Sequence, residues 1–178
     1  MNVMSDKARI FKARFSIADL RQQCNHQEVF TTALTKNETL EHFVLKLLGY
    51  CILSYDNHAV LNKFSDKLLP DVGIQALDAH YKTWLSVDQP NLDQLLKIAK
   101  QVDELLILTT GNSQWLNESA SRLKLLSNSH IIEIDQQFVN DIQMELTRSL
   151  NWNVLIDESS LMISDKAHCY ETKQFDWH

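Results

Sequence analysis

The sequence predicts a single α/β domain over residues 1–178, in which a mixed central β-sheet is flanked by helices. Two kinds of pattern predict this class. In short segments apolar and polar residues alternate, and in longer segments apolar residues recur every three to four positions. The two kinds follow one another along the chain. A length of 178 residues is typical of one domain, and no repeat or internal linker divides the chain.

The first predicted elements are two strands. Residues 8–17 alternate between apolar side chains and polar ones such as Lys12 and Arg14, which predicts a strand with one face in solvent. Residues 29–34 predict a second strand, and residues 24–26 the turn between them. We interpret the first of these strands as a solvated edge strand whose charges discourage aggregation.

A helix is predicted next, with Asn37 as its N-cap and Glu38 in its first turn, where a carboxylate opposes the positive end of the helix dipole. It ends near Ser54. Its apolar residues recur at helical spacing and predict an amphipathic helix with a broad buried stripe, made of Leu40, Phe43, Val44, Leu47, Leu48 and Cys51.

The remaining elements follow a polar connection at residues 55–70. Strands separated by a short polar loop predict hairpins, and a continuous apolar run predicts a strand covered on both faces. In order, we expect a hairpin of strands 72–77 and 82–88, a helix capped by Pro90-Asn91, a buried strand at 105–108, a helix from Ser113, a strand at 131–134, a helix from Gln136, and a terminal hairpin of strands 154–156 and 161–163.

Composition limits the function classes. Only three glycines occur, which excludes the glycine-rich loops that hold dinucleotides and nucleoside triphosphates. The three cysteines lack metal or disulfide spacing, so a reducing compartment is expected. No apolar run approaches a membrane span, and the N-terminus has no signal-peptide pattern. A net charge of −6 does not favour a general polyanion binder. We therefore expect a cytoplasmic protein with no membrane partner.

The segment from Leu69 to Lys97 carries the most chemical information. Many magnesium-dependent nucleases place an Asp at the start of one strand and an acid-x-Lys sequence on the next, because two carboxylates hold the hard cation and the lysine offsets developing charge. Asp71 supplies the first element here. The second reads Ser86-Val87-Asp88, with a hydroxyl in place of the acid and an acid in place of the lysine.

Several ordered segments together resemble the YaeQ family of bacterial proteins, and the resemblance runs over nearly the whole chain. The opening strand, the run that begins the first helix, and the central strand pair with the helix after it all carry it. The segments are Ala8–Ala13 with Ile17–Leu20, Asn37–Glu41 before Leu45–Leu48, and Pro70-Asp71 through Gln89-Pro90 to Lys97–Ala99.

The resemblance implies a variant of the PD-(D/E)XK fold, which is the restriction-endonuclease-like α/β fold, without a settled activity. The family usually carries an acid and then a glycine before the proline of the second strand. In this sequence those positions are Ser86 and Asp88, so the acid is lost at its usual place. A carboxylate two residues further on lies about 6.6 Å along the same strand face. It lines the same site without replacing the original ligand.

The expected site is completed by residues from two helices. Lys97 matches the family's helix lysine, although a solvated helix lysine is the simpler interpretation. Glu41 lies at the edge of the buried stripe of the first helix, where a site acid and an ordinary boundary glutamate are equally expected. Ser86 is most simply a small strand residue. The candidate magnesium ligands are Asp71 and Asp88. No histidine has metal-ligand spacing, so His42 and the others are interpreted as surface or half-buried side chains.

Two functions fit these patterns. The first is a magnesium-dependent phosphodiesterase acting on nucleic acid, with Asp71 and Asp88 on the metal and Lys97 or Lys82 near the phosphate. The second is a catalytically inactive module that binds a nucleic acid or a protein. Fold alone does not decide between them. Changing Lys12 and Arg14 to Glu should weaken nucleic-acid binding only if the strand face that carries them is the binding surface.

Overall fold

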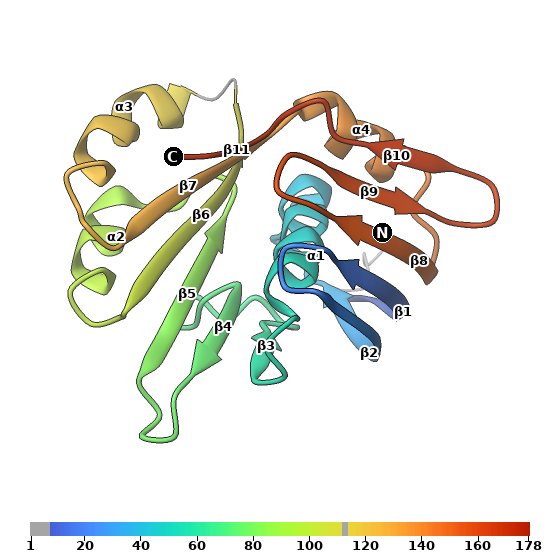
Figure 1. Cartoon of the computed structure of the whole chain (residues 1–178), viewed down its shortest axis with the longest axis horizontal. Helices are drawn as coiled ribbons and strands as arrows, with labels where there is room; N and C mark the ends of the chain where they lie inside the picture. Colours follow the sequence, from blue (N-terminus) through green and yellow to red (C-terminus); the bar gives the residue numbers. More distant parts are fainter. Residues whose placement is uncertain (1–7, 112–113) are drawn as a thin grey trace, which may run out of the picture.

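The computed structural model describes residues 8–111 and 114–178. In this part of the chain eleven strands and four helices form one α/β domain (Figure 1). The elements are β1 (Arg9–Asp19), β2 (Cys24–Leu34), α1 (Leu40–Leu53), β3 (Ala59–Leu61), β4 (Val72–Gln75), β5 (Tyr81–Val87), α2 (Leu92–Ile98), β6 (Glu104–Thr110), α3 (Gln114–Leu123), β7 (Ser129–Ile134), α4 (Gln136–Met144), β8 (Ser149–Ile156), β9 (Leu161–Ser164), β10 (Cys169–Glu171) and β11 (Phe175–Trp177).

The strands form two sheets, so the prediction of one central sheet was wrong, although the α/β class and the mixed pairing are confirmed. One sheet has five strands in the order β10-β9-β8-β1-β2, and the other has six in the order β11-β7-β6-β5-β4-β3. The chain leaves the first sheet after β2 and returns to it with β8. Sequence patterns report which strands exist, but they do not report which sheet each strand joins.

The β1 strand lies inside the five-stranded sheet, with β2 antiparallel on one side and β8 parallel on the other. Its interpretation as an edge strand was therefore wrong. The turn predicted at residues 24–26 was also misplaced, because the pairing of β1 with β2 extends to Asp19 opposite Cys24 and the turn occupies residues 20–23. The polar residues at the start of β2 are strand residues: Asn25 is on the exposed face, whereas His26 is on the other face, where its Nε2 lies 2.9 Å from Oγ of Ser54 at the end of α1.

The six-stranded sheet contains the predicted hairpin, formed by β4 and β5, whose register places Val72 opposite Leu85. The next two strands, β6 and β7, run parallel to β5, and helices α2 and α3 connect them. Every residue of β6 after Glu104 is buried, as the apolar run predicted. Three short strands were not predicted, namely β3, β10 and β11.

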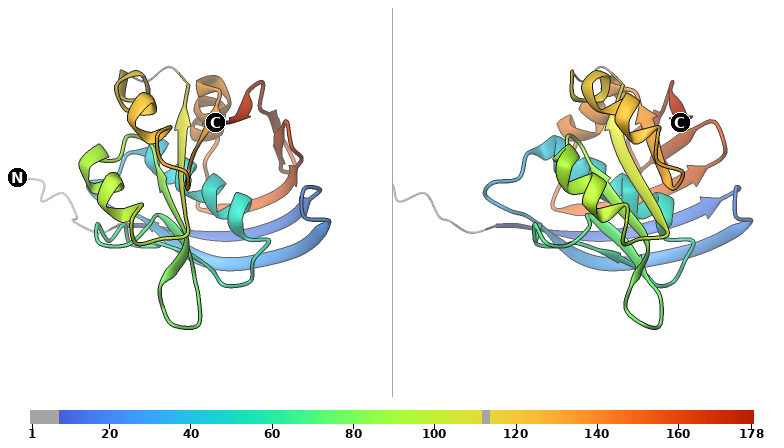
Figure 2. Two further views of the ribbon diagram at one scale, coloured as in Figure 1. Left: turned by 60° about the vertical axis from the view of Figure 1, so that its left-hand side comes forward. Right: turned by 90° about the vertical axis from the view of Figure 1, so that its left-hand side faces the viewer.

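Helix α1 lies between the two sheets (Figures 1 and 2). Its N-cap is Thr39 rather than the predicted Asn37, since the Thr39 side chain accepts a hydrogen bond from the backbone N–H of His42 at 3.1 Å. It ends at the C-cap Ser54, as predicted. Both sheets cover it, so it is buried on nearly all sides and not along one stripe. Its buried residues include the charged Lys46, which has no exposed side-chain surface.

Helices α2 and α3 cover the opposite face of the six-stranded sheet, where Trp84, Leu95 and Leu116 belong to a second apolar cluster. The predicted start of the third helix at Ser113 lies outside the described residues. No helix within residues 8–111 or 114–178 has the length and apolar character needed to cross a membrane. This layering brings three chain segments together at one end of the strands of the six-stranded sheet: the start of α1, the start of β4 and the end of β5.

Candidate functional site

A cavity of about 690 Å³, called the cleft below, opens at this end of the six-stranded sheet, where β4 begins and β5 ends. Its wall comes from the segment before α1, the segment before β4, the end of β5 and the inner side of α2. Three of the predicted site residues, Asp71, Ser86 and Asp88, all line it. The pairing of β4 with β5 thus brings together three of the residues that the sequence pattern predicted to share a site.

Asp71 is held by both of its carboxylate oxygens. Its Oδ2 accepts a hydrogen bond of 2.9 Å from the backbone N–H of Val87, the last residue of β5. Its Oδ1 lies 3.3 Å from Nε2 of His42. The side chain is 16% exposed, so the carboxylate is oriented by the protein and only partly reached by water. Both of its oxygens already have a partner.

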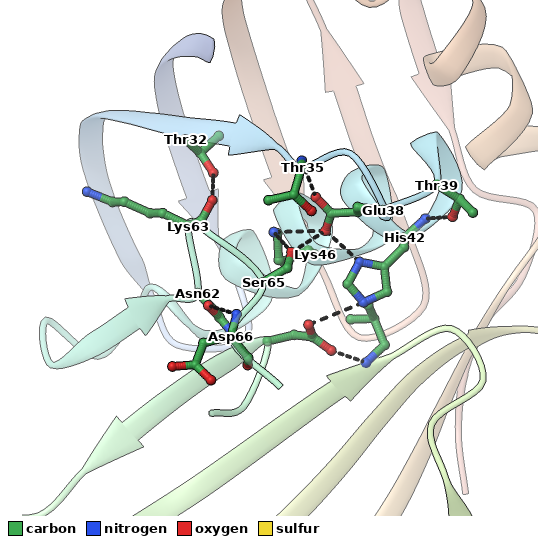
Figure 3. Close-up of polar contacts among 12 residues, drawn as sticks. Thr32, Thr35, Glu38, Thr39, His42, Lys46, Asn62, Lys63, Ser65 and Asp66 are labelled. Carbon is green, nitrogen blue, oxygen red and sulfur yellow. Dashed lines mark hydrogen bonds and ion pairs between the residues drawn. The ribbon is translucent and has the colours of Figure 1, made fainter. Parts of the chain in front are cut away.

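His42 forms the centre of a charged network at the base of the cleft (Figure 3). Its Nδ1 lies 2.6 Å from Oε2 of Glu38, while its Nε2 faces Asp71. Burial by itself lowers the pKa of His42, but the hydrogen bonds to Asp71 and Glu38 and the charges of these two groups outweigh it, and the pKa rises from 6.5 to about 9. The imidazole is therefore an imidazolium at neutral pH, held between two carboxylates.

Glu38 accepts hydrogen bonds from several residues of this network. Its Oε2 also accepts hydrogen bonds from Nζ of Lys46 at 2.9 Å and from Oγ of Ser65 at 2.8 Å. Burial raises its pKa, whereas the hydrogen bonds and positive charges around it lower the pKa to about 2. Lys46 donates to Ser65 as well, at 3.0 Å. The network fixes the segment before β4 to helix α1 and so shapes one side of the cleft.

Asp88 has no hydrogen-bond partner for its side chain among residues 8–111 and 114–178. Its backbone adopts a left-handed conformation with φ of 69°, which is uncommon outside glycine. Burial raises the pKa of its carboxyl group, and the charges of Glu41 and Asp71 raise it further, while His42 acts in the opposite direction. Ser86 is engaged, since its Oγ accepts a hydrogen bond of 3.1 Å from Nε1 of Trp84.

The other predicted site residues lie outside the lining of the cleft. Glu41 is near enough to influence Asp88 electrostatically, but its Oε1 accepts a hydrogen bond of 3.0 Å from Nε2 of Gln136 on α4. Lys97 is exposed on α2, whose inner side reaches the cleft through other residues. Lys82 is exposed near the opposite end of β5. The structure does not bring a lysine from either predicted position to Asp71.

The donor set at Asp71 does not fit a magnesium ion in the arrangement observed. Magnesium requires close, near-octahedral oxygen coordination. Asp71 directs one oxygen to a backbone N–H and the other to a protonated imidazole, which repels a second cation. Within residues 8–111 and 114–178, no group of three or more histidine, cysteine, aspartate or glutamate side chains is arranged to hold a metal ion.

Comparisons with known proteins place this architecture in one family. The sequence profile of the YaeQ protein family matches residues 4–174. The chain belongs to the YaeQ family. Its curated relatives include the uncharacterized YaeQ proteins of Escherichia coli K12, 21% identical, and Salmonella typhi, 19% identical, each alignment covering 98% of both chains.

Crystal structures of two YaeQ proteins share the fold. The protein from Pseudomonas syringae superimposes with a TM-score of 0.87 at 23% identity, covering 96% of this chain and 95% of that one. The protein from Xanthomonas axonopodis pv. citri superimposes with a TM-score of 0.86 at 18% identity, covering 95% and 98%. At these identities the likeness concerns the YaeQ fold.

The interpretation of His42 as an ordinary surface or half-buried residue missed the centre of the site in this YaeQ-family chain. A usable signal was present, because Glu38, His42 and Lys46 follow one another at intervals of four residues and so share one side of a helix. Charges of opposite sign at that spacing predict ion pairs along one helix face, although the spacing alone does not show that the pairs are buried. Ser65 had no such signal, since it comes from a distant loop.

Proposed function

We propose that this protein binds single-stranded nucleic acid in the cleft, on a variant of the PD-(D/E)XK nuclease-like frame, without metal-dependent hydrolysis. The observation that carries the proposal is the position of His42 between Glu38 and Asp71. An imidazolium there neutralises the carboxylate that begins β4, which is the carboxylate a nuclease of this frame uses to hold its cation. Both ring N–H groups are directed to carboxylates, so neither is available to activate water.

The rim of the cleft supports a single-stranded ligand. Lys36 and Lys67 are exposed on the two segments that border the opening, and Phe64, beside them, is 70% exposed. Basic side chains that follow the backbone, with an aromatic ring on which a base stacks, are the usual elements of single-strand binding. Phe64 is not unusual in its exposure, since Leu68 and Leu77 are exposed still further, but it is the aromatic side chain that lies on the rim beside Lys67.

The interior of the cleft supports contacts to bases and not to phosphates. The carboxylate of Asp88 would repel a phosphate, but it accepts hydrogen bonds, and the exocyclic amino groups of nucleobases donate them. Asn91 and Gln94 line the same wall and offer both donors and acceptors. We therefore expect phosphates at the lysine rim and one unstacked base inside.

Magnesium-dependent phosphodiester hydrolysis is the competing function. It is favoured by Asp88, whose partially buried carboxylate is unpaired among the described residues and close to the charges of Asp71 and Glu41. It requires that His42 release Asp71. The two functions predict different outcomes in one assay, because only hydrolysis consumes the strand and depends on the metal.

The experiment measures binding and integrity of labelled single-stranded DNA and RNA with the purified protein, in EDTA and in magnesium. We expect binding in EDTA and intact strands under both conditions. The double variant Lys36→Glu/Lys67→Glu should weaken binding by about tenfold or more. The matched control Lys82→Glu/Lys97→Glu changes charge equally at exposed positions outside the cleft and should shift the Kd by less than about threefold.

Two results would contradict the proposal. Cleavage that requires magnesium and disappears in Asp71→Ala would establish the hydrolytic function. Absence of binding to any strand, in protein whose circular dichroism shows a folded α/β chain, would leave a protein partner as the remaining ligand class.

A further inference from the structure

A second, smaller cavity of about 280 Å³ lies on the other side of the first turn of α1. Leu40, the first residue of α1, lines it, whereas the neighbouring Thr39 lines the cleft. The wall opposite Leu40 contains Arg9 at the start of β1 and Arg148 just before β8. One helical turn therefore separates two cavities that differ in charge.

The small cavity is lined by two guanidinium groups and no carboxylate. Arg9 and Arg148 form no ion pair with any acid of residues 8–111 and 114–178. The Arg148 guanidinium lies over the ring of Phe11, 5.7 Å from its centroid. Contact with an aromatic face orients a guanidinium while its N–H groups stay available. One guanidinium oriented by an aromatic ring and a second one on the same cavity wall, neither of them paired with an acid of the described residues, form a site for an oxyanion.

Two further bases extend this charge over the outer face of the five-stranded sheet. Lys12 and Arg14 are exposed there, opposite Ser149 and Asn151 of β8. Because β1 is an internal strand, protection of a sheet edge against aggregation does not explain these charges. Their backbone adjoins the cavity, since the N–H of Lys12 donates to the carbonyl of Arg148 at 2.8 Å. Their side chains lie on the sheet face opposite Phe11, so a strand that contacts both regions passes around the end of the sheet at which β1 begins.

We propose that Arg9 and Arg148 bind a phosphate group of the nucleic-acid strand that leaves the cleft, with Lys12 and Arg14 contacting the phosphates that follow. This inference rests on the proposed function, because it assigns to the same strand a second contact region beyond α1. The ligand chemistry is a phosphodiester, and the guanidinium pair recognises its two free oxygens. The chain is acidic overall at −6, so attraction of a strand requires such a local concentration of bases.

The test compares a short oligonucleotide, sufficient only for the cleft, with one several times longer. In the double variant Arg9→Gln/Arg148→Gln the longer strand should bind about tenfold more weakly, and the slope of log K against log salt should fall by about 1.4, as expected for two lost contacts to a single strand. Binding of the short strand should stay within about twofold. The matched control is Lys166→Gln/Lys173→Gln, which removes two exposed charges elsewhere.

The outcomes separate the two proposals. Equal weakening in the control, or an unchanged salt slope in the arginine variant while the short strand still binds, overturns the phosphate site and leaves the proposed function standing. Failure of the unmodified protein to bind either strand overturns the proposed function. In that case a titration with inorganic phosphate, followed through the arginine Nε–H NMR signals, tests whether the two arginines bind free phosphate. A shift of these signals indicates a site for free phosphate, and unchanged signals overturn the anion site entirely.

Discussion

Replacing His42 should remove most of the pH dependence of stability that the cleft contributes above about pH 6. The pKa of His42 is about 9 in the folded protein and 6.5 as the ordinary value. At about 1.4 kcal/mol for each pH unit, this difference corresponds to about 3 kcal/mol of stability from the protonated ring. The side chain is 25% exposed, and its two partners are 2% and 16% exposed, so solvent screening is limited.

The sign follows from the direction of the shift. A group whose pKa is raised on folding stabilises the protein fully below its unfolded pKa, and this contribution is lost as the pH rises through the folded pKa. The unmodified protein should therefore lose about 3 kcal/mol of unfolding free energy between about pH 6 and about pH 9.5 in urea titrations. In His42→Gln most of this dependence should disappear, and the stability near pH 6 should be lower.

The control is His58→Gln, since His58 is 67% exposed beside Asp56 and lies outside the cleft. It should retain the pH dependence of the unmodified protein. If His42→Gln and the unmodified protein lose stability in parallel across this pH range, the imidazolium does not hold Asp71 and Glu38 together. The argument for an internal cation at the cleft would then fail.

Three further outcomes are expected from urea or thermal unfolding. Lys46→Met should cost about 1.5–3 kcal/mol, because it removes one of the two cations beside the buried Glu38 carboxylate while His42 remains, and a loss below about 1 kcal/mol would contradict the pairing. Because the pKa of Glu38 is lowered from 4.5 to about 2, the stabilisation by its carboxylate is fully present above pH 4.5 and is lost as the pH falls through about 2. In Glu38→Gln this loss of unfolding free energy at acid pH should become smaller, and an unchanged loss would argue against the network. Gly49→Ala should cost about 1–3 kcal/mol, since the added Cβ would lie 2.8 Å from Cδ2 of the buried Leu85, and full stability would show that this contact relaxes freely.

Local patterns predicted most of the elements because the rules that govern them are local. Alternation in residues 8–17 and the apolar run at 105–108 each report the burial of a segment's own side chains, and both became strands. The partition into two sheets depends on which segments pair at long range. No local pattern carries that information, and the interpretation of β1 as an edge strand failed for this reason.

The candidate site was predicted in position but not in composition. Asp71, Ser86 and Asp88 line one cavity, because the pairing of β4 with β5 brings the residues before β4 and those at the end of β5 together. The network that holds Asp71 comes from the start of α1 and from the loop before β4, so Glu38, His42 and Ser65 join the site only through the packing of the helix against the sheet. Asn37 was predicted as the N-cap, but Thr39 has that role. Glu38 therefore lies before the helix, where its side chain joins the network with His42 and Lys46.

The difference between an internal imidazolium and a bound metal ion determines what the cleft can do. A magnesium ion keeps exchangeable positions for water and for a phosphoryl oxygen, and these positions are the source of its catalytic effect. An imidazolium offers two N–H groups, and in this protein both are directed to carboxylates. It orients Asp71, and through Glu38 and Ser65 it is linked to the loop that also carries Phe64 and Lys67. Under the proposed function the cleft holds a strand without cleaving it, and the affinity should then be set by the groups at the rim of the cleft.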